Sequence, residues 1–176
     1  MLIRNKGRRL ALAACAMVLL GGAVAARSGG PVLPEAITDP ELAQSDYVEN
    51  CGGCHGVQGV SAPAELPQLR NRVGYFMCTP EARAYLIRLP NVAHSRIRDN
   101  QELADLVNFV IFGLGGTSTP PGTRPFSAEE VAYERKFALS SASLKAERAR
   151  HVETAIRKCH APVSLRAFYP PQPAQP

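Results

Sequence analysis

The chain has 176 residues, of which 45% are hydrophobic and 20% charged, a balance typical of a globular domain rather than a disordered one. The formal net charge is +5, but the first 26 residues contribute four basic groups and no acidic ones, and the remainder carries 16 basic against 15 acidic groups. With this near-neutral balance no strong nucleic-acid-binding signal remains, so we expect no nucleic-acid partner.

The N-terminal segment has the pattern of a secretory signal peptide over residues 1–26. Residues 1–9 are basic, and residues 10–26 are apolar and end in small side chains. We expect cleavage near Ala25–Arg27, which leaves the mature protein in the periplasm without a membrane span. An uncleaved membrane anchor and lipidation at Cys15 are the alternatives.

Helical signals begin after a Gly- and Pro-rich flexible leader at residues 27–37. Asp39 and Pro40 supply an N-cap and a first-turn proline, which together predict a helix that runs into the sequence CGGCHG. Residues 56–78 are interrupted by glycine and proline and predict no long element.

Two further helices are predicted in the middle of the chain. Thr79 is a cap for a short helix over residues 81–89, which Pro90 ends. After a loop of about ten residues, Asn100 is expected to cap an amphipathic helix over residues 101–114, whose apolar side chains recur at helical spacing.

The remaining residues predict a helical C-terminal extension. Ser127 and Glu130 form a capping-box pattern, and one or two helices are expected over roughly residues 128–159. No alternating strand pattern is present, so the fold class is all-α. The expected organisation is a first helical domain at 38–116, a linker at 117–125, a helical extension at 126–165 and a proline-rich tail at 166–176.

Cys51, Cys54 and His55 form the sequence C-x-x-C-H, the signature of covalent haem attachment. Each of two thiols three positions apart can form a thioether to a haem vinyl group, and the adjacent imidazole then lies under the iron as proximal ligand. A thioredoxin-like motif requires a βαβ context, and a zinc site requires a second ligand pair. Neither pattern is present, so the motif predicts one covalently bound haem c.

With this motif the chain resembles the class I (mono-haem) cytochrome c family over about residues 38–115. That family packs an N-terminal helix, with an aromatic residue just before the haem motif, against a C-terminal helix with a second aromatic. Tyr47, four residues before Cys51, and Phe109 fit this pair, and the resemblance places Tyr47 at the cofactor. It implies a small cytochrome c-like helical haem domain.

The resemblance also implies a partner for the proximal ligand. A proline carbonyl of the family accepts a hydrogen bond from the proximal imidazole, which fixes the ring and raises its basicity toward iron. Pro67 matches this proline, with Pro63 as an alternative. No acid–base pair or nucleophile constellation stands out, so we expect an electron carrier rather than an enzyme.

The sixth iron ligand departs from the family, which takes a methionine from the loop before the last helix. The mature chain has one methionine, Met77, and it precedes the middle helix. His94 lies in the loop where the methionine is expected, so spacing favours His94 as the distal ligand, with Met77 as the alternative. An open iron position, which would bind small ligands such as O₂ or NO, is the third possibility. Methionine would raise the reduction potential and a second imidazole would lower it.

Cys78 and Cys159 remain after the haem motif and the signal peptide are assigned. An even pair in an oxidising compartment predicts a disulfide that ties the extension to the haem domain. The closed loop of about 80 residues would contribute roughly 4 kcal/mol. Two buried free thiols are the alternative.

Residues 70–98 hold six arginines and one acidic residue. Because this block brackets the expected distal loop, it predicts a basic ring around the haem edge that steers an acidic redox partner. The alternative is scattered solvated arginines, with one or two that hold haem propionates.

Together these patterns predict a monomeric periplasmic electron carrier. Its expected partners are a periplasmic dehydrogenase, a terminal oxidase or another cytochrome. Two other functions stay open: a haem-based sensor or binder of small ligands, and a cytochrome subunit of a periplasmic dehydrogenase complex that docks through residues 126–176.

Overall fold

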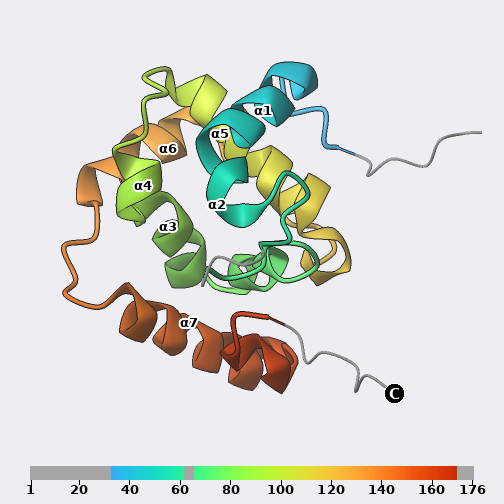
Figure 1. The fold of residues 1–176 in the computed structure, drawn as a ribbon, viewed down its shortest axis with the longest axis vertical. Coiled ribbons are helices and arrows are strands. Elements are labelled where there is room, and N and C mark those ends of the chain that lie inside the picture. Colours follow the sequence, from blue (N-terminus) through green and yellow to red (C-terminus); the bar gives the residue numbers. More distant parts are fainter. Residues whose placement is uncertain (1–32, 62–65, 170–176) are drawn as a thin grey trace, which may run out of the picture.

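The computed structural model describes residues 33–61 and 66–169, and these form helices and turns without a β-strand, in an all-α cytochrome c-like fold (Figure 1). The expected signal peptide and most of the leader lie outside the described residues, as does the end of the proline-rich tail. Within the described part of the chain, no helix is both long enough and apolar enough to cross a membrane.

Seven α-helices and several shorter helical turns make up the described chain. The α-helices are α1 (Pro40–Tyr47), α2 (Gly53–His55), α3 (Pro80–Arg88), α4 (Pro90–Ala93), α5 (Asn100–Asn108), α6 (Ala128–Glu134) and α7 (Leu144–Cys159). π-helical turns extend α1 and α5 over Val48–Gly52 and Phe109–Leu114, and 3₁₀ turns lie at Val73–Cys78, Gly116–Ser118, Arg135–Phe137 and Val163–Arg166.

Side-chain caps set the helix starts. Asp39, Thr79 and Ser127 each accept a hydrogen bond from a backbone N–H of the first turn, as their sequence context predicts. At α5 the prediction is off by one residue. Asp99 is the N-cap, because its backbone is extended and its carboxylate accepts from two N–H groups, whereas Asn100 is already helical.

Pro90 ends α3 and also begins α4, a short helix that the sequence analysis did not predict. Leu89 between the two helices has φ of −54° and ψ of 131°, close to the polyproline II conformation that residues before proline favour. Proline is tolerated at the first position of a helix because its missing N–H would have no intrahelical partner there.

The contact between α1 and α5 centres on two aromatic rings. Tyr47 is fully buried, and its ring centroid lies 5.8 Å from that of Phe109, so the aromatic pair expected from the resemblance is in contact. Asp105 of α5 accepts hydrogen bonds from the backbone N–H groups of Thr38 and Asp39. This contact ties the entry of α1 to α5.

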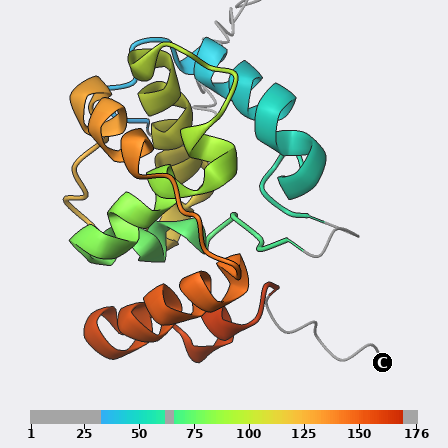
Figure 2. The same ribbon diagram turned by 90° about the vertical axis from the view of Figure 1, so that its left-hand side faces the viewer.

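The C-terminal extension packs into the same hydrophobic core as the haem-motif helices. Val131, Val152 and Leu165 are each at most 1% exposed and belong to the cluster that contains Tyr47. Helix α7 lies across one end of the molecule, beneath α3, in both views (Figures 1 and 2). A disulfide joins Cys78 to Cys159, with a Cα–Cα distance of 6.2 Å.

Asp46 of α1 is buried, and its Oδ2 atom has no hydrogen-bond partner among the described residues. Burial raises the pKa of this carboxyl, and the negative charge of Glu49 raises it further. The native state therefore holds the Asp46 proton to a higher pH than the unfolded chain does. The resulting stability is present at low pH and is lost as the pH rises through the native pKa.

Asp46→Asn is accordingly expected to stabilise the protein at pH 7 by about 1 kcal/mol, since it removes a buried, incompletely bonded carboxylate. The gain should shrink as the pH falls through the raised pKa of Asp46, because the carboxyl of the wild-type native state is then protonated. Thermal unfolding followed by circular dichroism from pH 3 to pH 8 measures this difference. Glu41→Gln, at an exposed position on the same helix, is the control. A difference that does not change with pH would contradict the argument.

Candidate functional site

A cavity of about 400 Å³ opens beside the Cys51–His55 motif. This volume lies in the range of small-molecule and cofactor pockets. The cavity is lined mainly by apolar side chains, and its walls come from α1 to α5, the segment 66–76 and the C-terminal extension. Cys51, Cys54 and His55 all lie at its wall.

The helical path of the motif explains how its three side chains reach one cavity. Helix α1 continues through the π-helical turn into α2, so no loop separates Tyr47 from His55. Cys51 is partly buried, and burial raises the pKa of its thiol to about 11, with the neighbouring Cys54 adding to this effect. Cys54 is exposed at the mouth of the cavity.

The orientation of the His55 ring is fixed by a backbone carbonyl group that accepts from its Nδ1 atom. Its Nδ1 atom lies 3.2 Å from the carbonyl oxygen of Pro67, the partner that the family resemblance implies. With the hydrogen on Nδ1, the ring donates to this carbonyl and Nε2 keeps its lone pair. Burial lowers the pKa of His55, so the imidazole is neutral at pH 7 and suited to bind a metal ion. Pro63, the alternative partner, lies outside the described residues.

Tyr47 supports the motif from the core side. The ring lines the cavity, and its hydroxyl donates a 2.6 Å hydrogen bond to the carbonyl of Gly56, the residue after His55. Burial raises the pKa of Tyr47 to about 12, so it remains a donor at neutral pH. Tyr47 therefore fixes the end of the motif as well as packing on Phe109.

Gly56 has a left-handed backbone conformation with φ of 75°, and a Cβ atom at this position would collide with the carbonyl oxygen of Val60. Gly56→Ala is therefore expected to destabilise the protein by about 2 kcal/mol or more. Gly53→Ala is the matched control, because Gly53 is helical and an added Cβ meets no atom within 4 Å. Urea unfolding of the two variants measures the difference, and equal stabilities would contradict it.

The part of the cavity wall that comes from α3 to α5 is largely apolar. Leu86 and Leu89 reach it from α3 and its end, Val92 from α4, and Ile97 from the loop that follows. From α5 and its extension come Leu103, Leu106, Val107, Val110 and Ile111. Such a lining excludes water from one face of a flat apolar ligand and favours its burial.

Neither predicted distal ligand lines this cavity. His94 ends α4 with an exposed side chain, although its neighbours Val92 and Ser95 both contribute to the wall. Met77 is partly buried and packs against the hydrophobic core beside Cys78. Among the described lining residues, His55 is the only histidine, and none is a methionine.

The sequence analysis missed the contribution of the C-terminal extension to the cavity. Leu144, Lys145 and Arg148 of α7 line it, together with Leu165 and Phe168 after that helix. A signal existed for Arg148. It lies four and seven residues before Val152 and Ala155, so it occupies a position on the buried face of α7.

The basic block at residues 70–98 is only partly a surface feature. Arg83 and Arg88 form ion pairs with Glu130 and Glu134 of α6, which places both within the contact between α3 and α6. Arg72 is buried. The exposed arginines of the block include Arg96 and Arg98, in the loop after α4.

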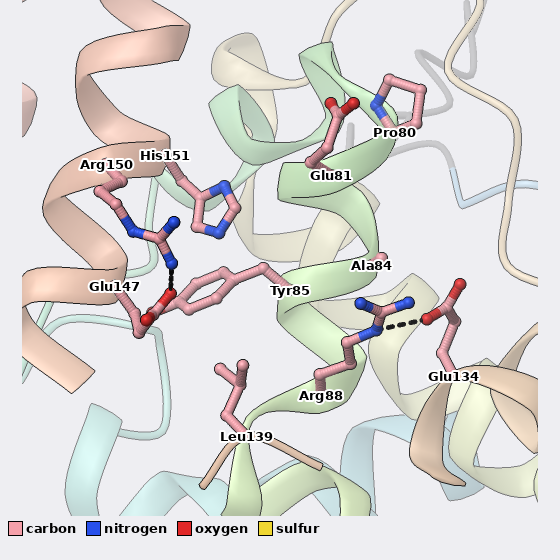
Figure 3. Close-up of a pocket in the computed structure, with 10 residues that line it drawn as sticks. All are labelled: Pro80, Glu81, Ala84, Tyr85, Arg88, Glu134, Leu139, Glu147, Arg150 and His151. Atoms are coloured by element: carbon pink, nitrogen blue, oxygen red, sulfur yellow. Dashed lines mark hydrogen bonds and ion pairs between the residues drawn. The ribbon is translucent and has the colours of Figure 1, made fainter. Parts of the chain in front are cut away.

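A second cavity, of about 390 Å³, lies between α3 and α7 (Figure 3). The Tyr85 ring contacts His151 at a centroid distance of 4.5 Å and also lines the first cavity. Glu147 pairs with Arg150 within α7, and Arg88 pairs with Glu134 across the helices. Most charged side chains of this cavity therefore have an ion-pair partner within the protein, and the cavity is a polar gap between α3 and α7.

Comparison with known proteins relates the chain to c-type cytochromes. It is 26% identical over 127 residues to a cytochrome c-552 of Thermus thermophilus, across 61% of this chain and 86% of that protein. It is 25% identical over 115 residues to a second Thermus thermophilus cytochrome c-552, across 56% of this chain and 88% of that protein. No protein-family model and no solved structure match the chain.

Proposed function

From this relationship to c-type cytochromes, we propose that the protein is a periplasmic mono-haem cytochrome that carries electrons between redox partner proteins. One observation carries the proposal: Cys51, Cys54 and His55 share one apolar cavity, and His55 is held by the Pro67 carbonyl. Two thiols and a neutral imidazole form the donor set that covalent haem attachment requires. A bound haem would supply an iron that takes up and releases one electron.

The residues of the chain hold, orient and shield such a cofactor. Cys51 and Cys54 would anchor it through two thioether bonds, and His55 would coordinate the iron. Pro67 fixes the orientation of the imidazole and increases the electron density at its free nitrogen. The apolar wall from α3, α4 and α5 keeps water from the buried face, while Cys54 marks an exposed edge through which electrons can pass.

The sixth iron ligand remains part of the proposal. His94 is our first candidate and Met77 the second, and either would have to turn inward from its place outside the cavity wall. A second function, the binding of a small ligand at an open iron position, is favoured if neither side chain turns inward, because the described wall holds neither of them. A cytochrome subunit docked through residues 126–176 is the third candidate, although much of α7 packs on the chain's own core.

Optical and near-infrared magnetic circular dichroism spectra of the matured protein test these alternatives. We expect covalent haem, a reversible one-electron couple and a low-spin ferric state with two imidazole ligands. His94→Ala should then convert the iron to high spin. A methionine charge-transfer band would replace His94 by Met77, and a high-spin wild type would support the small-ligand site. A protein that matures without covalent haem would overturn the proposed function.

A further inference from the structure

Two arginines are buried at the cavity without an acidic partner. Arg72 is 6% exposed and Arg148 is 7% exposed, and both line the cavity that contains His55. Within the described residues, neither guanidinium group forms an ion pair with a carboxylate. Burying a charged group without a counter-charge is costly, so the pair indicates that an anion belongs beside them.

The contacts of these arginines leave their charge uncompensated. Nη2 of Arg72 donates to the carbonyls of Ser164 and Ala167, at 2.8 and 2.7 Å, and Nη2 of Arg148 donates to the carbonyl of Leu165, at 3.0 Å. The Nε atom of Arg72 is buried and has no hydrogen-bond partner in the described part of the chain. Backbone carbonyls satisfy some N–H groups but do not neutralise two positive charges.

The positive charge of Arg72 also acts on the guanidinium group of Arg148. Burial lowers the pKa of Arg72 and of Arg148, and the positive charge of Arg72 contributes to the lowering at Arg148. Arg148 further lies over the rings of Phe76 and Phe168, with 5.9 and 5.1 Å between Cζ and the ring centroids. Two like charges in one largely apolar cavity wall would be stabilised by a ligand that carries more than one negative charge.

Haem has one edge that bears two propionate carboxylates, and the rest of the ring is apolar. The lining of the cavity likewise has an apolar part and a cationic part. Helix α5 contributes apolar side chains, and the positive charges come from Arg72, Arg148 and the exposed Lys145. Arginine suits this role because its planar N–H groups pair with carboxylates.

We propose that Arg148 of the C-terminal extension, together with Arg72, binds the propionates of the haem, so that α7 forms a wall of the cofactor site. The inference rests on the proposed function, and it assigns a cofactor-binding residue 93 positions after His55. It also gives the extension a role that does not require a partner protein. The disulfide at Cys159 then holds a cofactor-binding helix in place.

The test compares three variants of the matured holoprotein by spectroelectrochemistry from pH 5 to pH 8. Arg148→Met removes the charge, Arg148→Lys keeps it, and Arg157→Met removes an exposed charge from the same helix. A positive charge beside the haem favours the ferrous state, so Arg148→Met should shift the potential downward. The potential should also become pH-dependent, because a propionate then titrates in this range. Arg148→Lys should retain most of the wild-type potential, and Arg157→Met all of it.

Equal potentials in Arg148→Met and Arg157→Met, without a new pH dependence, would overturn the inference while the haem protein itself stands. If Arg148→Met fails to mature, the pH dependence of the wild-type potential tests the inference instead. A potential that is flat over this pH range supports paired propionates, and one that falls steadily overturns the inference. A wild type without covalent haem would overturn the proposed function and the inference with it. Haem-peptide mass spectrometry distinguishes this case from the others.

Discussion

A variant in which both Cys51 and Cys54 are serine is expected to mature without covalent haem and to lose most of its helical structure. Serine has no sulfur from which to form a thioether. The cavity of about 400 Å³ would then be left without its cofactor. At about 24 cal/mol per Å³, an empty apolar cavity of this size costs at most on the order of 10 kcal/mol. This cost is comparable with the whole free energy of unfolding of a small domain.

Haem staining on denaturing gels and far-ultraviolet circular dichroism check the two parts of this prediction. Each single serine variant keeps one thiol and should retain stainable haem at reduced yield. Gly53→Ala, between the two cysteines, should retain haem fully because the added methyl group meets no neighbour. A double variant with wild-type helix content and a cooperative unfolding transition would show that the fold does not depend on the cofactor.

The second large effect is expected when Cys78 and Cys159 are both replaced by serine. The disulfide closes a loop with a sequence separation of 81 residues, and its removal increases the conformational entropy of the unfolded chain. In the chain-entropy model the free energy of unfolding should fall by about 4 kcal/mol. The first region to open should be α7, since the crosslink fixes its C-terminal end to the 3₁₀ turn Val73–Cys78.

Urea unfolding with and without a thiol reductant, with the haem iron held in the ferrous state in every sample, measures this effect and supplies its control. Reduced wild-type protein should match the double serine variant, and the variant itself should not respond to the reductant. Amide hydrogen exchange should show faster exchange in α7 than in α5 once the bond is absent. An unfolding midpoint that reductant leaves unchanged in the wild type would refute the prediction.

Local signals in the sequence predicted much of the helical framework. Asp39, Thr79 and Ser127 mark helix starts because short polar side chains satisfy N–H groups that the first turn leaves without partners. The C-x-x-C-H motif is equally local, and its three side chains reach one cavity. The Asp99 difference arises where two neighbouring residues compete for a boundary, which sequence patterns resolve only to a residue or two. Helix α4 was missed because a proline such as Pro90 can end one helix and also occupy the first position of the next.

The cavity wall could not be predicted in the same way, because it depends on contacts between distant segments. Arg148 is 93 residues from His55 in the chain, and only the packing of α7 brings it to the same cavity. His94 shows the converse. Its chain position matches the loop of the family ligand, but the short helix α4 leaves its side chain exposed while Val92 and Ser95 face the cavity. Spacing locates a loop, and backbone conformation decides which of its residues face inward.

The position of the disulfide has a consequence for the order of biosynthesis. Cys51 and Cys54 lie outside the covalent loop that Cys78 and Cys159 close. Disulfide formation and the proposed haem attachment therefore act on separate segments of the chain. The four thiols of the described residues allow three fully paired arrangements, and two of them cross-link the motif to Cys78 and Cys159. In the third, the motif cysteines pair with each other, and that bond must be reduced before haem can attach. If the motif binds haem as proposed, correct assembly requires oxidation of the distant pair and reduction of the motif, until thioether formation removes the motif thiols from exchange.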